Sequence, residues 1–227
     1  MFGALWNRIF GGKGGAGPRA PAAPAVSVPA RADDPVAALR DHVRREVAGG
    51  YYDDDAILTN AHALFGDDLP ADQLRHAASA ALRAALADHR AAERDWHDAT
   101  DCDRIDAAFA ALEAQGIVAR QNFTCCGTCG ASEIWDEIEA AQADGVAVQG
   151  YAFFHMQDTD AAVDGHGLML HYGACEGGEA ASIAVGHRVV AALEAQGLVT
   201  CWDGALRQRI GVPMDWKRRR ALVALEG

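Results

Sequence analysis

Three of the six cysteines in the chain lie within five residues, in the stretch Phe123-Thr-Cys-Cys-Gly-Thr-Cys-Gly130. Thiolates are favoured ligands of Zn²⁺, and the two-residue gap between Cys126 and Cys129 lets both sulfurs bind one tetrahedral ion. Cys125 offers a third thiolate to the same ion. Because this gap is also that of a dithiol redox motif, the stretch predicts sulfur chemistry without deciding between metal binding and redox.

Three cysteines leave one position of a tetrahedral zinc site to be filled from elsewhere in the chain. We expect a strand over residues 146–157, which would place His155 on the same face as Gln157 and beside the cysteine stretch. Other donors are His171, Cys102 and Cys175. The predicted metal site therefore consists of Cys125, Cys126, Cys129 and His155, with zinc as the expected cofactor.

Two other interpretations of the cysteines stay open. Thiol redox chemistry by Cys126 and Cys129 would use the N–H groups of a helix N-terminus to stabilise a thiolate. The carboxylates that follow, Glu133, Asp136 and Glu137, argue against it, because their field should raise the pKa of a neighbouring thiol. The third interpretation is a non-catalytic interaction module whose cysteines are small buried residues of a tight turn. The sequence shows no Ser/His/Asp triad or phosphate-binding glycine loop, so we lean against an enzyme.

Composition and charge narrow the class of protein. The chain has 227 residues, a hydrophobic share of 50% and a net charge of −12, which suit a globular protein. This charge argues against general nucleic-acid binding, because phosphate affinity comes from clustered Lys and Arg. The cysteine content is far below that of a disulfide-stapled secreted domain, so we expect a reducing, cytoplasmic compartment. The basic run Lys217-Arg-Arg-Arg220 is expected to be a solvated terminal face.

The N-terminal 34 residues are expected to lie outside the folded part. Residues 1–10 place apolar side chains at helical spacing and predict a short amphipathic segment that contacts a membrane surface or a protein partner. The segment is too short to span a bilayer, and Asn7 and Arg8 interrupt any signal-peptide core. Residues 11–34 are rich in Gly, Pro and Ala and predict a disordered linker.

The remaining chain is expected to form a helical part over residues 35–116 and an α+β sandwich over residues 117–220, with a shared core. Asp34-Pro35 predicts the start of the first helix. Further helices are expected from residues 53–55 to Gly66, from Pro70 to Trp96, and from an Asp103 cap to Gly116.

Strands and helices are expected to alternate in the second part. Strands are predicted over residues 117–123, 146–157, 167–172, 198–202 and 206–212, and helices over residues 132–145 and 180–196, with Ser132 as the first cap. Residues 158–166 are expected to form a hairpin connection, and Asp203-Gly204 a hairpin turn. This order predicts a ferredoxin-like split β-α-β sandwich with an extra C-terminal edge strand, preceded by the helices.

Four stretches resemble a bacterial family known only as a domain of unknown function. They are Phe123-Thr-Cys-Cys-Gly-Thr-Cys-Gly130, Phe153-Phe-His-Met-Gln-Asp-Thr159, Gly197-Leu-Val-Thr-Cys-Trp-Asp-Gly204 and Asp215-Trp-Lys-Arg-Arg219. The resemblance extends from about Val36 to Arg220. It implies a bacterial, cytosolic protein and brings no activity, cofactor or catalytic residue with it.

Overall fold

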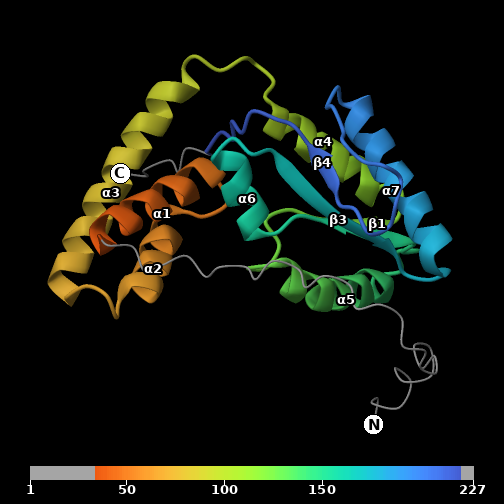
Figure 1. Cartoon of the computed structure of the whole chain (residues 1–227), viewed down its shortest axis with the longest axis horizontal. Coiled ribbons are helices and arrows are strands. Elements are labelled where there is room, and N and C mark those ends of the chain that lie inside the picture. The colour runs from red at the N-terminus through yellow and green to blue at the C-terminus, as the bar shows by residue number, and fades with distance from the viewer. Residues whose placement is uncertain (1–33, 221–227) are drawn as a thin grey trace, which may run out of the picture. The chain divides into compact units, whose positions relative to one another are not determined.

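The computed structural model describes residues 34–220, so the amphipathic segment predicted for residues 1–10 and nearly all of the predicted linker lie outside the described residues. The predicted α+β class is confirmed, with helices first and then a mixed four-stranded sheet interleaved with helices (Figure 1). The elements follow in the order α1 (Pro35–Gly49), α2 (Asp54–Phe65), α3 (Ala71–Glu93), α4 (Asp101–Glu113), β1 (Ile117–Arg120), α5 (Gly127–Ala143), β2 (Gly150–Phe153), α6 (Met156–Val163), β3 (Leu168–Ala174), α7 (Gly178–Ala195) and β4 (Ile210–Val212).

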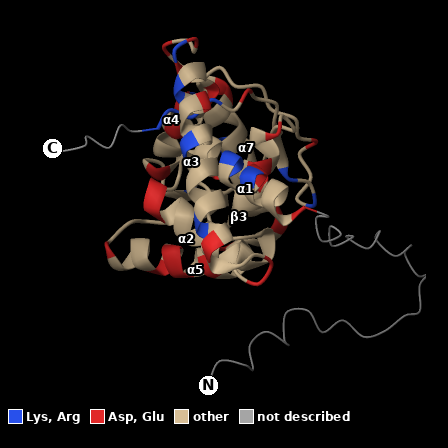
Figure 2. Cartoon of the chain, turned by 90° about the vertical axis from the view of Figure 1, so that its left-hand side faces the viewer, with Lys and Arg blue, Asp and Glu red and all other residues tan. Residues whose placement is uncertain are grey.

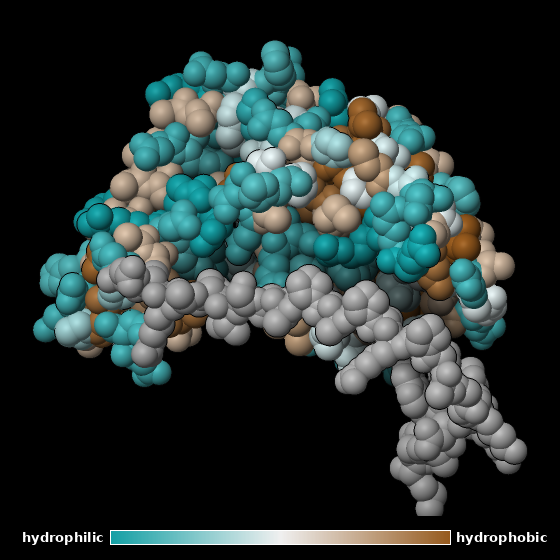
Figure 3. Space-filling model, in the orientation of Figure 1, coloured by the Kyte–Doolittle hydropathy of each residue, from teal (hydrophilic) through white to brown (hydrophobic). Residues whose placement is uncertain are grey.

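Helices α1, α2 and α3 pack together around a core of their own. The predicted start of α1 is confirmed, because the Asp34 side chain accepts hydrogen bonds from the N–H groups of Val36 and Ala37. The helix ends at Gly49, and the C-cap residue Gly50 has a left-handed φ of 77°, which suits glycine. The side chains that meet between the three helices include Leu39, Val43, Val47, Ile57, Ala61, Leu74, Ala78 and Leu82. On the face shown in Figure 3, the visible surface over these helices is mainly hydrophilic.

Helix α4 packs on the sheet, and its cap differs from the prediction. Thr100 is the N-cap residue, and its hydroxyl accepts from the Asp103 N–H while the Asp103 carboxylate accepts from the Thr100 N–H. Asp103 is therefore the third helical residue of a capping box and not the cap itself. Ile105, Phe109 and Leu112 of α4 join the core formed by the sheet and α7.

The sheet has the strand order β1-β2-β3-β4. Strands β1 and β2 are parallel and hydrogen-bonded neighbours, from the pair Ile117 and Gly150 to the pair Arg120 and Phe153, while β3 is antiparallel to both β2 and β4. The predicted ferredoxin-like topology is not confirmed, since a split β-α-β unit would place another strand between β1 and β2. Helices α4 and α7 cover one face of the sheet and α5 covers the other (Figure 1).

Three predicted β segments are much shorter than expected. The strand expected over residues 206–212 is limited to β4. The strand expected over residues 146–157 is limited to β2, because His155 caps α6 and the chain turns into that helix. The prediction of a hairpin connection over residues 158–166 was therefore wrong, because α6 occupies most of this range. Of residues 198–202, only Cys201 bridges to the sheet, through reciprocal backbone hydrogen bonds with Gly211.

The basic run near the C-terminus was wrongly expected to be a solvated face. Arg218 forms two hydrogen bonds with the Asp106 carboxylate, at 2.8 and 3.1 Å, and its guanidinium lies 4.6 Å from the ring centre of Tyr51. Arg220 pairs with Asp54 at 3.0 Å. These contacts use the basic side chains to tie the last described residues to α4 and α2, within a surface where acidic and basic residues are interspersed (Figure 2).

Glu46 of α1 lies in a partly buried polar contact with α2. Its Oε1 accepts a hydrogen bond from Asn60 Nδ2 at 2.9 Å. Burial raises the pKa of this carboxyl from 4.5 to about 7, and the negative charge of Asp160 adds to the rise. The folded protein therefore binds more protons than the unfolded chain between these two pKa values, so its stability falls as the pH rises through this window.

We expect Glu46→Gln to reduce this pH dependence, because glutamine keeps an acceptor for Asn60 and carries no charge. Urea unfolding at about pH 5 and about pH 8 measures the difference in the free energy of unfolding. The matched control is Glu139→Gln, which changes an exposed glutamate of α5 and should leave the difference unaltered. An unchanged pH dependence in Glu46→Gln would show that Glu46 is not its source.

Candidate functional site

The cysteine stretch forms the turn into α5, and this helix begins earlier than predicted. Cys126 is the N-cap residue, with extended backbone, and Gly127 is the first helical residue. The prediction that Ser132 caps this helix was therefore wrong. Gly127 and Gly130 have low helix propensity, so packing on the sheet, and not propensity, extends the helix back to the cysteines.

Two residues just before the cysteines have left-handed backbone. The φ angle is 49° at Asn122 and 59° at Thr124, and within residues 34–220 no other non-glycine residue has a positive φ. The Asn122 side chain accepts a hydrogen bond from Thr159 Oγ1 at 2.8 Å, and Thr124 Oγ1 donates to the Cys126 carbonyl at 3.2 Å. Such backbone persists where its surroundings fix it, and it concentrates at functional sites.

The three thiols meet at this turn. The sulfur atoms of Cys125, Cys126 and Cys129 lie within 4.8 Å of one another, and the Cys125 and Cys129 sulfurs are 3.5 Å apart. In a tetrahedral zinc site the Zn–S bonds of about 2.3 Å place two sulfurs about 3.8 Å apart. Cys125 is exposed and the other two are half-buried, so an ion can reach all three.

The pKa values of two of these thiols are shifted in opposite directions. Hydrogen bonds from Cys129, first from its backbone N–H, and from the Thr128 N–H lower the pKa of Cys126. Contacts with the sulfurs of Cys125 and Cys126 raise the pKa of Cys129 to about 11. The carboxylates Glu133, Asp136 and Glu137 were expected to raise the pKa of a neighbouring thiol. The pKa of Cys126 is instead lowered, because the earlier helix start places backbone donors at its sulfur, and the rise at Cys129 comes from the other two sulfurs.

His155 lies next to the cysteine turn but in a second cluster. It is buried at the N-cap of α6, where its Nδ1 accepts a hydrogen bond from the Asp158 N–H at 3.2 Å and its Nε2 lies 3.1 Å from Asp158 Oδ2. Ligand atoms of His155, Asp158 and His171 lie within 4.8 Å of one another. The structure thus gathers the three cysteines in one cluster and places His155 in an adjoining one.

Arg209 completes the second cluster. Its Nη1 lies 2.9 Å from Asp158 Oδ1 and 3.3 Å from His171 Nε2. The His171 ring stacks on Phe153, with ring centres 4.7 Å apart and an angle of 5° between the planes. Burial, followed by the charge of Arg209, lowers the pKa of His171 to about 4, so this ring is neutral at physiological pH.

The two clusters touch through glycines of the cysteine stretch. A Cβ on Gly127 would lie 3.0 Å from His171 Cε1, 3.1 Å from its Nε2 and 3.5 Å from His155 Cδ2. A Cβ on Gly130 would lie 2.5 and 2.8 Å from ring atoms of Phe153. The absence of both side chains therefore lets the first turn of α5 rest on the histidine rings and on the sheet.

The remaining predicted donors lie outside both clusters. Cys102 is buried in α4, where burial raises the pKa of its thiol to about 12. Cys175 follows β3 and packs beside the hydrophobic cluster under α5. Neither belongs to a group of potential metal ligands among residues 34–220.

Sequence reasoning missed the roles of Asp158 and Arg209. The spacing of His155 and Asp158 is that of a helix cap and its third helical residue, a signal that the strand prediction obscured. Arg209 carries no local signal. It reaches the cluster because it directly precedes β4, whose Ile210 pairs with Leu170, the residue before His171.

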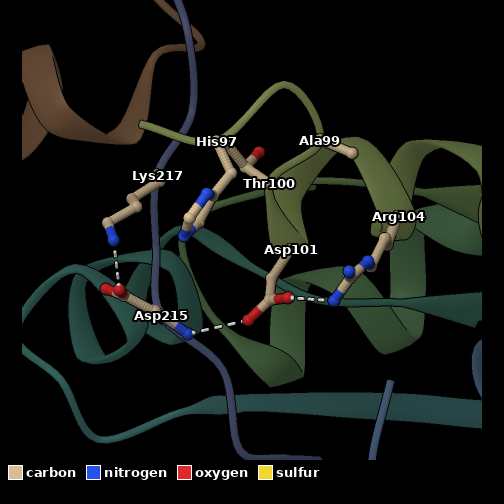
Figure 4. A pocket seen from close by; sticks show the side chains of 7 residues that line it. All are labelled: His97, Ala99, Thr100, Asp101, Arg104, Asp215 and Lys217. Carbon is tan, nitrogen blue, oxygen red and sulfur yellow. Dashed lines mark hydrogen bonds and ion pairs between the residues drawn. The ribbon is translucent and has the colours of Figure 1, made fainter. Parts of the chain in front are cut away.

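A small pocket lies elsewhere, between the start of α4 and the C-terminal segment (Figure 4). Its charged groups pair with one another: Lys217 lies 2.7 Å from the Asp215 carboxylate, and Arg104 lies 3.0 Å from that of Asp101. The Asp215 N–H also donates to Asp101. These contacts join two segments of the fold, and we assign no ligand to them.

Residues 32–220 match the family described as Domain of unknown function (DUF6891), which covers all described helices and strands. The chain belongs to this family. Both clusters lie inside the DUF6891 region, and the resemblance seen in the sequence is confirmed. Among curated proteins and among solved structures, no significant match to the chain is found. Within residues 34–220, no helix has the length and apolar character needed to span a membrane.

We expect Gly130→Ala to destabilise the protein by about 1–3 kcal/mol, because the new methyl group overlaps the buried Phe153 ring. This loss exceeds the roughly 1 kcal/mol that alanine gains in helix propensity. Urea unfolding measures the change. Phe153→Leu, combined with Gly130→Ala, should recover part of the loss, and a Gly130→Ala variant of unaltered stability would contradict the described packing.

Proposed function

We propose that this protein binds a thiophilic metal ion, with zinc the expected one, through Cys125, Cys126 and Cys129. The observation that carries the proposal is the position of three sulfurs within 4.8 Å of one another on an accessible turn. We further propose a cytoplasmic, bacterial setting, as the sequence predicts. All six cysteines are free, which is consistent with a reducing environment.

The electrostatics of the turn support a thiolate site. Zinc binds deprotonated cysteines, so any feature that favours a thiolate favours the metal. The N-terminus of α5 supplies backbone donors to Cys126 and a partial positive charge beside the cluster. For the fourth position the sequence predicts His155. A site closed by four protein ligands would be structural and non-catalytic, whereas one with a water in that position would be open to chemistry.

Elemental analysis of protein purified under reducing conditions tests the proposal. We expect about one zinc ion per chain, and we expect the thiols of Cys125, Cys126 and Cys129 to react only after chelation. Cys125→Ser, Cys126→Ser and Cys129→Ser should each lose most of the metal. Cys201→Ser is the matched control, because Cys201 is an exposed cysteine outside the cluster, and it should retain the metal. Failure to bind zinc or cobalt after reconstitution would exclude the proposal.

Dithiol redox chemistry is a second candidate, favoured by the opposite pKa shifts of Cys126 and Cys129. The Cys126 thiolate would attack a low-molecular-weight disulfide and release one of its sulfurs as a thiolate. Cys129, after losing its proton to solvent, would then attack the Cys126 sulfur of the mixed disulfide and release the second. The protein dithiol is oxidised to a disulfide, and the small disulfide is reduced to two thiols.

The two candidates differ in their need for Cys125. If dithiol chemistry operates, metal-free Cys125→Ser should form a Cys126–Cys129 disulfide with oxidised dithiothreitol, and excess reduced dithiothreitol should reverse it. Mass spectrometry identifies the bond. Cys126→Ser and Cys129→Ser should not form it. If metal-free Cys125→Ser forms no such disulfide, the redox candidate fails while the metal proposal stands.

A further inference from the structure

The hydrogen bond at Nδ1 of His155 fixes the position of the proton on its ring. A backbone N–H can only donate, so Nδ1 accepts from Asp158 and carries no proton. In a neutral ring the proton is then on Nε2, which lies 3.1 Å from Asp158 Oδ2. Binding a metal through Nε2 would require the ring to shift this proton and break the cap of α6.

The His171 ring has the opposite arrangement. Arginine has no acceptor, so the Arg209 guanidinium donates to His171 Nε2, which therefore carries a lone pair. This is the form of imidazole that binds a metal. The Arg209 side chain is 39% exposed and also pairs with Asp158, so it can leave Nε2 and keep its partner carboxylate.

The position of His171 favours the cysteine site. Its Nε2 edge contacts Gly127, which separates Cys126 from Cys129, at 3.1 Å from where a Cβ would stand. Stacking on Phe153 and the pairing of β3 with β2 hold the ring in this orientation. We infer that His171 is the fourth ligand of the cysteine site and makes it a Cys₃His centre. This inference rests on the proposed metal binding.

The surrounding charges suit such a centre. Three thiolates and one divalent ion carry a net charge of −1, and a neutral imidazole leaves it unchanged. Arg209 and Asp158, which stand beside His171, form an ion pair that adds no net charge to the centre. The second cluster would thus act as the outer shell of the metal site, with His171 as the member that reaches the ion.

Cobalt binding by the full chain tests the inference, because cobalt–thiolate bonds absorb strongly in the near ultraviolet and the visible bands report the other ligands. His171→Phe keeps a ring that can stack on Phe153 and removes the nitrogen ligand. We expect it to weaken cobalt binding by more than the roughly 10- to 100-fold lost with an outer-shell partner, and to change the visible bands. His155→Asn, in which asparagine still caps α6, should lose no more than the roughly 10- to 100-fold of an outer-shell partner and leave the visible bands unchanged. His62→Asn is the matched control, because His62 is an exposed histidine of α2 outside both clusters, and it should bind cobalt as wild type does.

His171→Cys provides a rescue, since a fourth thiolate should restore tight binding and increase the sulfur absorption. Circular dichroism establishes whether each variant is folded. If His171→Phe is not folded, the result for His171→Cys alone tests the inference. Unchanged bands in His171→Phe or no added sulfur absorption in His171→Cys would overturn the inference while leaving the three-cysteine site intact. Loss of binding in His155→Asn alone would assign the fourth position to His155. The absence of any sulfur absorption in wild type would remove the metal proposal itself.

Discussion

The close contact between the first turn of α5 and the sheet is the constraint on which the rest of the site depends. Gly130 lies directly on the Phe153 ring, and Gly127 lies on the edge of His171. Side chains at these positions would push α5 outward and carry the cysteines away from the histidines. Because Phe153 also stacks on His171, one buried ring positions both the helix that bears the thiols and the imidazole beside them.

The electrostatics at the turn would favour metal binding and redox chemistry alike. A helix N-terminus that stabilises the Cys126 thiolate would help it bind a cation or attack a disulfide. What separates the two is the third sulfur, since Cys125 has a clear role as a metal ligand and none in a two-thiol exchange. Its sulfur lies 3.5 Å from that of Cys129, which is why metal binding is the stronger proposal.

The C-terminal basic residues illustrate how charge is used elsewhere in this acidic protein. Arg218 and Arg220 are paired with carboxylates of α4 and α2, so the run stabilises the fold and offers no free basic surface.

The sequence by itself determined the features that depend on local chemistry. The Asp34-Pro35 start of α1 and the crowding of three thiols in one turn follow from near neighbours in the chain. Tertiary structure decided the start of α5, because packing of Gly127 and Gly130 on the sheet outweighs their poor helix propensity. It also decided the strand order and brought Arg209 to Asp158 and His171, since pairing between distant strands leaves no local signal in the residues that it joins.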